Sequence, residues 1–240
     1  TASITLSDEV LRNVPYSQRS YEIVDLAPGV NNLVAYGASY MTGVAPSVDG
    51  VNVSEPMAGG VWVVLDANIF EEAKVMGVGL PAEYGGFSGV IFNLVTKSGG
   101  NEFSGHIELN YQGLDTDWPQ GLWQAETVGA YIASFPYRTA PRLRMLDGSA
   151  HLGGPIRKDK LWFYAGVQWC ETWRYPTGFP LPADTLQPRV FGKVSAQPTP
   201  TLSLSAWLEG DLWNVDDGGG SALTSPEATY RIRSSEIVGN

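Results

Sequence analysis

The chain has 240 residues, of which 43% are hydrophobic and 17% are charged, and its formal net charge is -10. This composition is typical of an ordered chain, and the acidic balance argues against nucleic acid as a partner, because a phosphate-binding surface needs clustered Lys and Arg. The single cysteine, Cys170, excludes an internal disulfide and a cysteine-built metal site.

Membrane signals lie in the aromatic residues rather than in long apolar runs. Aromatic residues make up 11% of the chain, with 8 Trp, and such side chains gather at membrane–water interfaces. The start, Thr1 to Thr5, does not read as a signal peptide, so we expect that one was removed or lies upstream. The best apolar run, 61–65, ends at Asp66, far short of the ~18 residues of a spanning helix. A membrane location therefore predicts a β-barrel.

The first hundred residues predict short mixed elements joined by glycine-rich links. A short helix is expected over 17–26, ending before Pro28-Gly29, and Asp49-Gly50 is expected to form a turn. The expected strands are 4–6, 34–36, 45–48, 69–76 and 90–97. Together these elements predict a compact α/β domain of about a hundred residues.

After Gly105 the pattern changes to alternation of apolar and polar residues. Over 189–196, for example, Val190 and Val194 face one side while Arg189 and Lys193 face the other. The alternating segments are 106–111, 146–156, 161–169, 189–196 and 202–209, and a further one is expected to start at 229–234. Period-two alternation in consecutive segments predicts β-strands.

The connections between these strands are short at one end and long at the other. The short ones are 157–160 and 197–201, and the long ones are 112–145, 175–188 and the stretch from 214 onward. Outer-membrane barrels have this asymmetry, with strands that cross in about 9–11 residues. A soluble β-sandwich also alternates and stays an alternative. Trp residues near strand ends favour the membrane: Trp162, Trp169, Trp173 and Trp213.

The number of strands predicts an incomplete barrel. Every backbone group in hydrocarbon must be paired, so a barrel has to close, and single-chain barrels have at least about eight strands. The alternating segments are fewer than that. We therefore expect the chain to be a piece of a larger barrel protein that ends before the barrel closes.

One long motif points to a family. Residues 71–105 read EEAKVMGVGLPAEYGGFSGVIFNLVTKSGGNEFSG, which closely resembles the C-terminal half of the plug domain of TonB-dependent outer-membrane receptors. Three earlier segments also resemble motifs of this family: Asn13-Val14-Pro15, LAPGV at 26–30 and SVDGV at 47–51. The motifs follow one another in the family's order.

A second motif and one departure refine the resemblance. HLGGPIRKDKLWF at 151–163 resembles a barrel hairpin common in large receptors of this group that carry a carboxypeptidase-regulatory-like domain at the N-terminus. Tyr36-Gly37-Ala38-Ser39 stands where many family plugs have an Arg-Gly turn. The departure weakens any transfer of detail from siderophore-type members.

The resemblance implies an α+β plug domain over 1–104, followed over 105–240 by the N-terminal strands of an antiparallel transmembrane β-barrel that is truncated. It implies energised uptake of an unknown extracellular ligand across the cell outer membrane. The implied partners are outer-membrane lipid and an inner-membrane energy-transducing TonB-type protein, which acts through an N-terminal segment missing from this sequence. No partnership with nucleic acid is expected.

Two other functions stay open. In the first alternative, the protein has the same outer-membrane architecture but serves adhesion, secretion or surface display. The second is a soluble β-rich carbohydrate-binding domain, which predicts folding without detergent. Transport that is lost when the inner-membrane partner is deleted distinguishes the leading hypothesis from the first of these alternatives.

The sequence predicts no enzyme, no cofactor, and no catalytic or metal-binding residue, and it leaves the ligand-binding residues unknown. Ser88 lies in a stretch that is similar to a nucleophile elbow, but Val90 occupies the place of the last glycine. Gly77-Val78-Gly79 lacks the third glycine of a dinucleotide loop and is interpreted as a linker. His106 and His151 fall on polar strand faces, which predicts that both point into a lumen.

The remaining candidates have structural interpretations. Asp216 and Asp217 precede Gly218-Gly219-Gly220 and are expected in a solvated loop rather than a cation site. The run 61–65, with Trp62, is expected in the plug core, while the plug surface is expected to be polar. Gly85, Gly86 and Gly89 are expected to allow tight turns and close approach to the barrel wall. Residues 96–100 are expected to form a polar, flexible exit from the plug.

Overall fold

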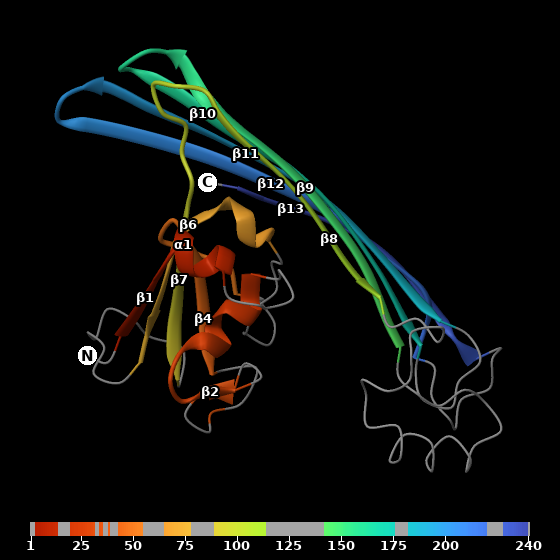
Figure 1. The fold of residues 1–240 in the computed structure, drawn as a ribbon. Coiled ribbons are helices and arrows are strands. Elements are labelled where there is room, and N and C mark those ends of the chain that lie inside the picture. The colour runs from red at the N-terminus through yellow and green to blue at the C-terminus, as the bar shows by residue number, and fades with distance from the viewer. Residues whose placement is uncertain are drawn as a thin grey trace.

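The computed structural model describes residues 3–13, 20–31, 34–35, 38, 43–54, 65–77, 89–113, 142–175, 182–219 and 228–239. Within these ranges the chain forms an N-terminal unit of short helices around a small sheet, followed by a long sheet of six strands. Figure 1 shows the N-terminal unit lying against one face of the long sheet. We call this the inner face and the opposite side the outer face.

The N-terminal unit contains a five-stranded mixed sheet with the order β1-β6-β7-β4-β5. Strands β4 and β7 are parallel, and the other neighbours are antiparallel. The elements are β1 (Ser3–Ser7), α1 (Asp8–Asn13), η1 (Ser20–Leu26), β2 (Val30–Asn31), β3 (Val34–Ala35), β4 (Val44–Val48), β5 (Val51–Asn52), η2 (Ala67–Ile69), β6 (Phe70–Met76) and β7 (Val90–Thr96), where η marks a 3-10 helix. The predicted strands are all found, with ends that differ by one or two residues.

The helices differ from the prediction. The expected helix over 17–26 is a 3-10 helix from Ser20 to Leu26, and 17–19 lie outside the described residues. The α-helix α1 was not predicted, because six residues are too few to show a helical period. Asp8 and Glu9 in its first turn complement the positive end of the helix dipole. The Asn13 side-chain amide donates to the Glu9 carbonyl oxygen at 2.7 Å and holds its other end.

Strand β7 lies in the middle of the small sheet and carries much of its core. Val90 and Phe92 are each 1% exposed. Gly89 precedes them, and an added Cβ there would collide with the Gly43 carbonyl oxygen. The close approach at Gly89 is therefore to another backbone segment of the N-terminal unit and not to the barrel wall as expected. Gly85 and Gly86 lie outside the described residues.

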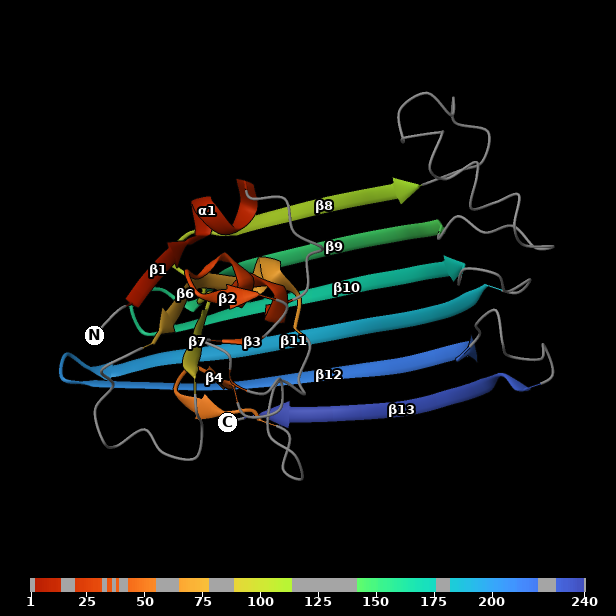
Figure 2. The same cartoon turned by 90° about the horizontal axis from the view of Figure 1, so that it is seen from below.

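The long sheet is an antiparallel meander with the order β13-β12-β11-β10-β9-β8. Figure 2 shows its strands side by side in this order. They are β8 (Ser104–Gly113), β9 (Arg142–Arg157), β10 (Leu161–Tyr175), β11 (Ala183–Thr199), β12 (Leu202–Gly218) and β13 (Tyr230–Gly239). Every strand predicted from alternation is present. Within the described residues β8 and β13 are not paired with each other, so the sheet is open.

All three long connections are shorter than predicted, since β8 also reaches Gly113 and β9 starts at Arg142. Strand β10 reaches Tyr175 and β11 starts at Ala183, while β12 continues to Gly218. Trp173 pairs with Asp184 and Val215 pairs with Ile232 in these extensions. Ladder hydrogen bonds need only the backbone, so the strands continue beyond the region where apolar residues alternate.

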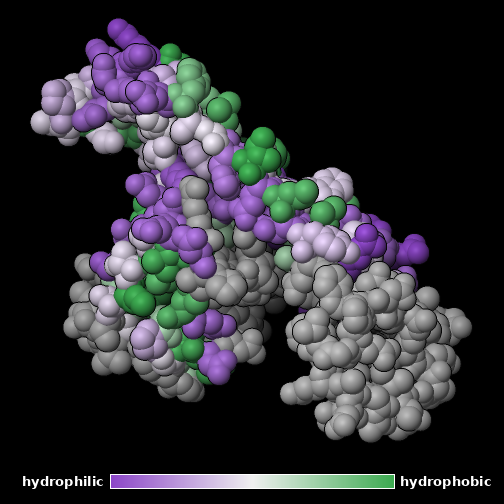
Figure 3. All heavy atoms as spheres, in the orientation of Figure 1, coloured by the Kyte–Doolittle hydropathy of each residue, from purple (hydrophilic) through white to green (hydrophobic). Residues whose placement is uncertain are grey.

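The two faces of the long sheet differ in chemistry. Inner-face residues are largely polar or aromatic and are buried, as Gln168 and Arg189 are. Outer-face residues are largely apolar, and many are exposed, with Ile107 82% and Ile237 76% exposed. Figure 3 shows hydrophobic side chains along the side of the sheet away from the N-terminal unit. None of the helices that the structure describes is long and apolar enough to cross a membrane.

Candidate functional site

The N-terminal unit meets the inner face on a ladder of rings from neighbouring strands. The ring centroids of His151 and Tyr164 lie 6.0 Å apart, and those of Phe191 lie 6.3 Å from both Tyr164 and Trp207. The last three residues belong to the same buried cluster as the core of the N-terminal unit. The expectation that this unit has a polar surface is therefore wrong at the contact, because aromatic side chains of the sheet extend its core.

A buried ion pair fastens the N-terminal unit to β11. The Lys193 ammonium donates to Asp49 Oδ2 at 3.0 Å, to Thr96 Oγ1 at 2.8 Å and to the Thr96 carbonyl oxygen at 3.2 Å. Asp49 also accepts from the Thr96 backbone N–H at 2.9 Å and from its hydroxyl at 2.6 Å. Lys193 is 7% exposed, so all three of its donors are used away from water.

The predicted turn at Asp49-Gly50 supplies that carboxylate. Both residues have a left-handed backbone, with φ of 48° and 84°, which Asp and Gly tolerate best. The prediction of a turn is confirmed, but the partner of Asp49 was not foreseen. Lys193 lies 144 positions further along the chain, and nothing in its own strand marks it as different from other inner-face residues.

A second contact joins the short helix η2 to β9. Asp66 accepts a hydrogen bond from the Asn68 backbone N–H at 2.9 Å and so caps η2. Its other oxygen lies 2.9 Å from His151 Nε2, and both side chains are buried. The Asn68 amide donates to Ser149 Oγ at 3.3 Å. His151 thus lies on the inner face, as alternation predicts, and contacts the N-terminal unit.

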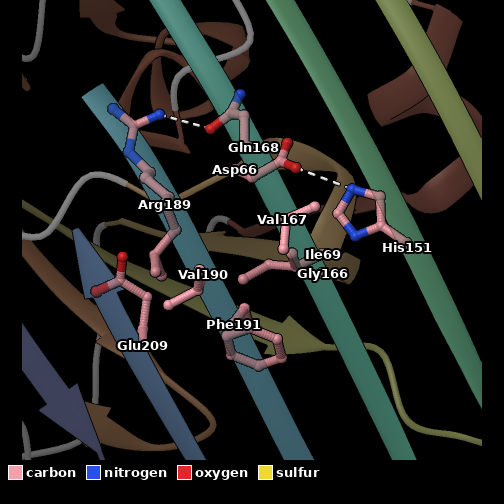
Figure 4. Close-up of a pocket in the computed structure, with 11 residues that line it drawn as sticks. Asp66, Ile69, His151, Gly166, Val167, Gln168, Arg189, Val190, Phe191 and Glu209 are labelled. Atoms are coloured by element: carbon pink, nitrogen blue, oxygen red, sulfur yellow. Dashed lines mark hydrogen bonds and ion pairs between the residues drawn. The ribbon is translucent and has the colours of Figure 1, made fainter. Parts of the chain in front are cut away.

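A small cavity remains between η2 and the sheet, with ionisable side chains around it (Figure 4). Arg189 donates to the Gln168 side-chain oxygen at 2.6 Å, and Gln168 donates to Asp147 at 2.8 Å. Glu209 is 2% exposed, and one of its oxygens has no partner among the described residues. The cavity volume of about 10 Å³ has room for one water molecule. The arrangement can hydrate a polar interface but is too small for an organic ligand.

The residues after β7 are held rather than flexible. The Lys97 ammonium lies 2.7 Å from Asp8 Oδ1 and donates to the Asn68 carbonyl oxygen at 2.8 Å. A Cβ on Gly99 would collide with the Phe163 carbonyl oxygen. The predicted flexible exit over 96–100 is therefore wrong, because glycine here permits a tight backbone contact with the sheet.

The next residues fix the connection to a hairpin turn of the sheet. Asn101 accepts from the Asp159 backbone N–H and from Trp162 Nε1, both at 2.8 Å. An open hollow of about 460 Å³ lies beside this contact. It is lined by Ser98, Gly99, Gly100, Asn101, Trp162, Lys193, Ser195, Ser203 and Ser205.

The other candidate site residues have structural partners or lie outside the described residues. Asp216 accepts two hydrogen bonds from Arg233, at 2.7 and 2.9 Å, and lies 3.3 Å from Arg231. Asp217 accepts from the Thr229 hydroxyl at 3.0 Å. No cluster of His, Cys, Asp or Glu that fits a metal ion occurs in the described part of the chain. The candidates outside it are Ser88, Val78-Gly79, Gly220 and 61–64.

No known protein-family profile matches the chain. The TonB-dependent transporter Oar of Myxococcus xanthus is 33% identical over 154 residues, which are 62% of this chain and 14% of that protein. The motifs, the fold and this relative agree. The chain is similar to the TonB-dependent outer-membrane receptors. The family recognised from the motifs and the location in the outer membrane are thereby confirmed.

Solved structures agree with this kinship at the level of fold. The siderophore receptor PirA from Pseudomonas aeruginosa has a TM-score of 0.64 and 19% identity, over 89% of this chain and 34% of that one. PirA from Acinetobacter baumannii has a TM-score of 0.64 and 17% identity, over 94% and 34%. The pyoverdine receptor FpvA from Pseudomonas aeruginosa has a TM-score of 0.61 and 13% identity, over 90% and 28%.

The chain spans 14% of the curated relative and about a third of the PirA structures. These relatives are named as transporters and receptors, which agrees with the expectation that this chain is not an enzyme. The subgroup with a carboxypeptidase-regulatory-like domain stays a prediction.

Proposed function

We propose that the chain is the plug and the first barrel strands of a receptor that takes up a ligand across the outer membrane. The plug would be residues 1–104 and the barrel strands 105–240. The observation that carries the proposal is the two-sided sheet, with an α/β unit seated on its polar inner face and apolar side chains exposed on its outer face.

The outer face has the chemistry of a lipid contact. Its exposed apolar residues on neighbouring strands include Ile107, Leu109, Val167, Val190, Leu208 and Ile237. Strand β10 has 15 residues, and β11 and β12 have 17, whereas a tilted strand crosses in about 9–11. The strands are therefore longer than a bilayer crossing requires.

The open sheet would be a section of a larger barrel. Lipid-exposed edges leave backbone groups unpaired, which hydrocarbon does not tolerate. We therefore propose that further strands pair with the edges β8 and β13. The share of the similar receptor structures that this chain covers, about a third, supports this interpretation.

The contacts at the inner face fit a plug that moves in part. Charged and polar contacts, such as Lys193 with Asp49, can exchange for water, whereas the aromatic ladder favours continued contact. An inner-membrane energy-transducing protein of the TonB type would supply the work. Adhesion, surface display and soluble carbohydrate binding gain no support from the comparisons.

The membrane placement is tested with two neighbouring residues of β11 that face opposite sides. Val194→Cys and Ser195→Cys are each made in a Cys170→Ala background and labelled with an environment-sensitive fluorophore. We expect brominated phosphatidylcholine to quench the label at Val194→Cys and to leave the one at Ser195→Cys nearly unchanged. Equal quenching at both positions contradicts the proposed orientation.

Uptake is tested in cells that make the full-length protein. Ferric enterobactin and ferric pyoverdine, the types of ligand named for similar structures, are the first probes, loaded with radioactive iron. We expect energised uptake that disappears when the gene for the TonB-type partner is deleted. In the adhesion or display alternatives, deletion of the partner leaves the function of the protein unchanged.

Plug movement has a test that needs no identified ligand. Asn68→Cys, in the Cys170→Ala background, is expected to react with a maleimide only in cells that contain the inner-membrane partner, because Asn68 is 7% exposed at rest. The matched control is an exposed position, Thr201→Cys, which should react in both strains. Equal labelling of Asn68→Cys with and without the partner contradicts energised movement.

A further inference from the structure

An arginine on the outer face lies between two aromatic rings. Arg144 Cζ is 4.8 Å from the centre of the Trp173 ring and 5.9 Å from the centre of the Tyr111 ring. Trp173 is the direct cross-strand partner of Arg144, and Tyr111 lies diagonally across β8. Both contacts are within the range of a cation–π interaction. The two rings thus restrict where the guanidinium can lie.

Among the described residues, no carboxylate engages the N–H groups of that guanidinium, and Arg144 is exposed. Arg231 and Arg233 differ, since both are paired with Asp216. A guanidinium presents parallel N–H donors that match the oxygens of a phosphate.

Tyr111, Arg144 and Trp173 lie at the end of the apolar outer surface. On β8 the outer-face residues run from Ile107 through Leu109 to Tyr111, near the end of the strand at Gly113. Arg144 and Trp173 lie equally near the strand ends that lead into the longer connections. Aromatic and basic side chains at such a boundary sit at the level of lipid headgroups.

We propose that Tyr111, Arg144 and Trp173 form a binding site for the phosphate of an anionic lipid headgroup in the leaflet on the side of the long connections. This inference rests on the proposed function, because it needs the outer face to be in lipid. The aromatic rings orient the guanidinium, and the guanidinium binds the phosphate oxygens through two N–H groups.

A nearby carboxylate allows a second substitution whose expected effect on lipid binding is opposite to that of removing Arg144. Glu171 lies on the outer face of β10, two residues before Trp173, and forms no ion pair with Arg144 within the described residues. Its negative charge opposes an anionic headgroup at the site. Removal of that charge should therefore tighten lipid binding, whereas removal of the Arg144 charge should weaken it.

The experiment measures binding of phosphatidylglycerol to the full-length protein in nonionic detergent by native mass spectrometry. We expect R144A to weaken binding at least about tenfold, since it removes the charge-assisted hydrogen bonds to the phosphate. R144K should fall between wild type and R144A, because it keeps the charge but loses the planar group. R233A is the matched control and should bind as wild type does, and E171Q should bind more tightly.

The outcomes are distinct. The proposal is overturned if R144A binds phosphatidylglycerol as well as wild type does, if R233A weakens binding equally, or if millimolar inorganic phosphate displaces the lipid. Circular dichroism of each variant verifies that the sheet is folded. Lack of lipid quenching at Val194→Cys overturns the proposed membrane placement itself. Quenching there, together with an unaffected R144A, overturns only the lipid site.

Discussion

The N-terminal unit and the long sheet place their apolar side chains in opposite ways. Phe92 of the N-terminal unit is 1% exposed, whereas Ile107 of the sheet is 82% exposed. In the sheet the polar residues are buried instead, as Gln168 is at 4%. Both regions consist largely of strands, so strand formation does not decide where apolar side chains go. The medium that each face meets decides it, which for the outer face is lipid in our proposal.

The boundary between the two regions combines both chemistries. The aromatic ladder joins the apolar core of the N-terminal unit, while the ion pair of Lys193 and Asp49 crosses from one region to the other. Apolar contact gives area without direction, and the charged contact sets orientation because its geometry is specific. Substitutions on the two sides of this boundary should therefore differ in size and in dependence on the medium.

The largest contrast is expected between matched apolar truncations. Phe92→Ala should lower the free energy of unfolding by about 3–5 kcal/mol, because it removes a buried aromatic side chain and leaves a cavity. Ile107→Ala in detergent should change it by well under 1 kcal/mol, because its side chain meets the micelle. Urea unfolding followed by tryptophan fluorescence measures both. Equal losses would mean that the outer face is buried against protein.

Loss of the charge at Lys193 should destabilise the boundary almost as strongly. Lys193→Ala leaves Asp49 buried without its cation, which costs about 3–5 kcal/mol when a buried pair is broken on one side. The double variant Lys193→Met with Asp49→Asn should recover most of that loss. Thermal unfolding of the three proteins tests this, and an equally unstable double variant would show that packing rather than charge is lost.

A charge at the centre of the outer face should destabilise the protein only in a membrane. Val190 is 57% exposed and lies near the middle of β11. The substitution Val190→Lys should therefore lower the stability of the protein in a bilayer by about 2–4 kcal/mol. Thr201→Lys, in a turn, is the control and should cost close to nothing. Folding yield into phosphatidylcholine vesicles measures both. Equal yields for the two variants contradict a lipid contact at Val190.

A single neutral hydrogen bond across the boundary should have a smaller effect. Ser149→Ala removes the acceptor of the Asn68 amide and should cost about 0.5–1.5 kcal/mol. Ser203→Ala, at an exposed position of β12, is the control and should be neutral. Denaturation midpoints of the two variants, measured side by side, decide whether the contact exists in solution.

The smallest effect is expected for the exposed ion pairs of Asp216. Asp216→Ala should cost at most about 1 kcal/mol, because water screens Arg231 and Arg233 at this surface. The difference from wild type should shrink as salt is raised from 0.1 to 1 M, as screening predicts. A large, salt-independent loss would place these residues in a buried contact.

Much of the sheet was predictable because its pattern is local. Alternation over 189–196 assigns Arg189 and Lys193 to one face and Val190 and Val194 to the other, and the structure agrees. The strand ends were less predictable. Residues such as Trp173 and Asp184 pair through their backbones, so the side-chain pattern does not record where the ladder stops.

The contacts at the boundary were not predictable from the same pattern. Asp49 looks like an ordinary turn residue, and His151 looks like any polar residue of an alternating strand. Their partners are Lys193 and Asp66, which lie far away in the sequence. The glycine-rich stretch around Gly99 predicts flexibility, whereas the missing Cβ of Gly99 allows contact with the backbone of β10.

The sequence by itself indicated the family, the strands of the long sheet and the face to which each residue of an alternating segment belongs. These features follow from motifs and from a period of two residues, which act over short stretches of chain. Tertiary structure alone decided which inner-face residues meet the N-terminal unit, and it held a glycine-rich exit in place. Those contacts depend on how elements far apart in the chain are positioned, and only the folded backbone sets that.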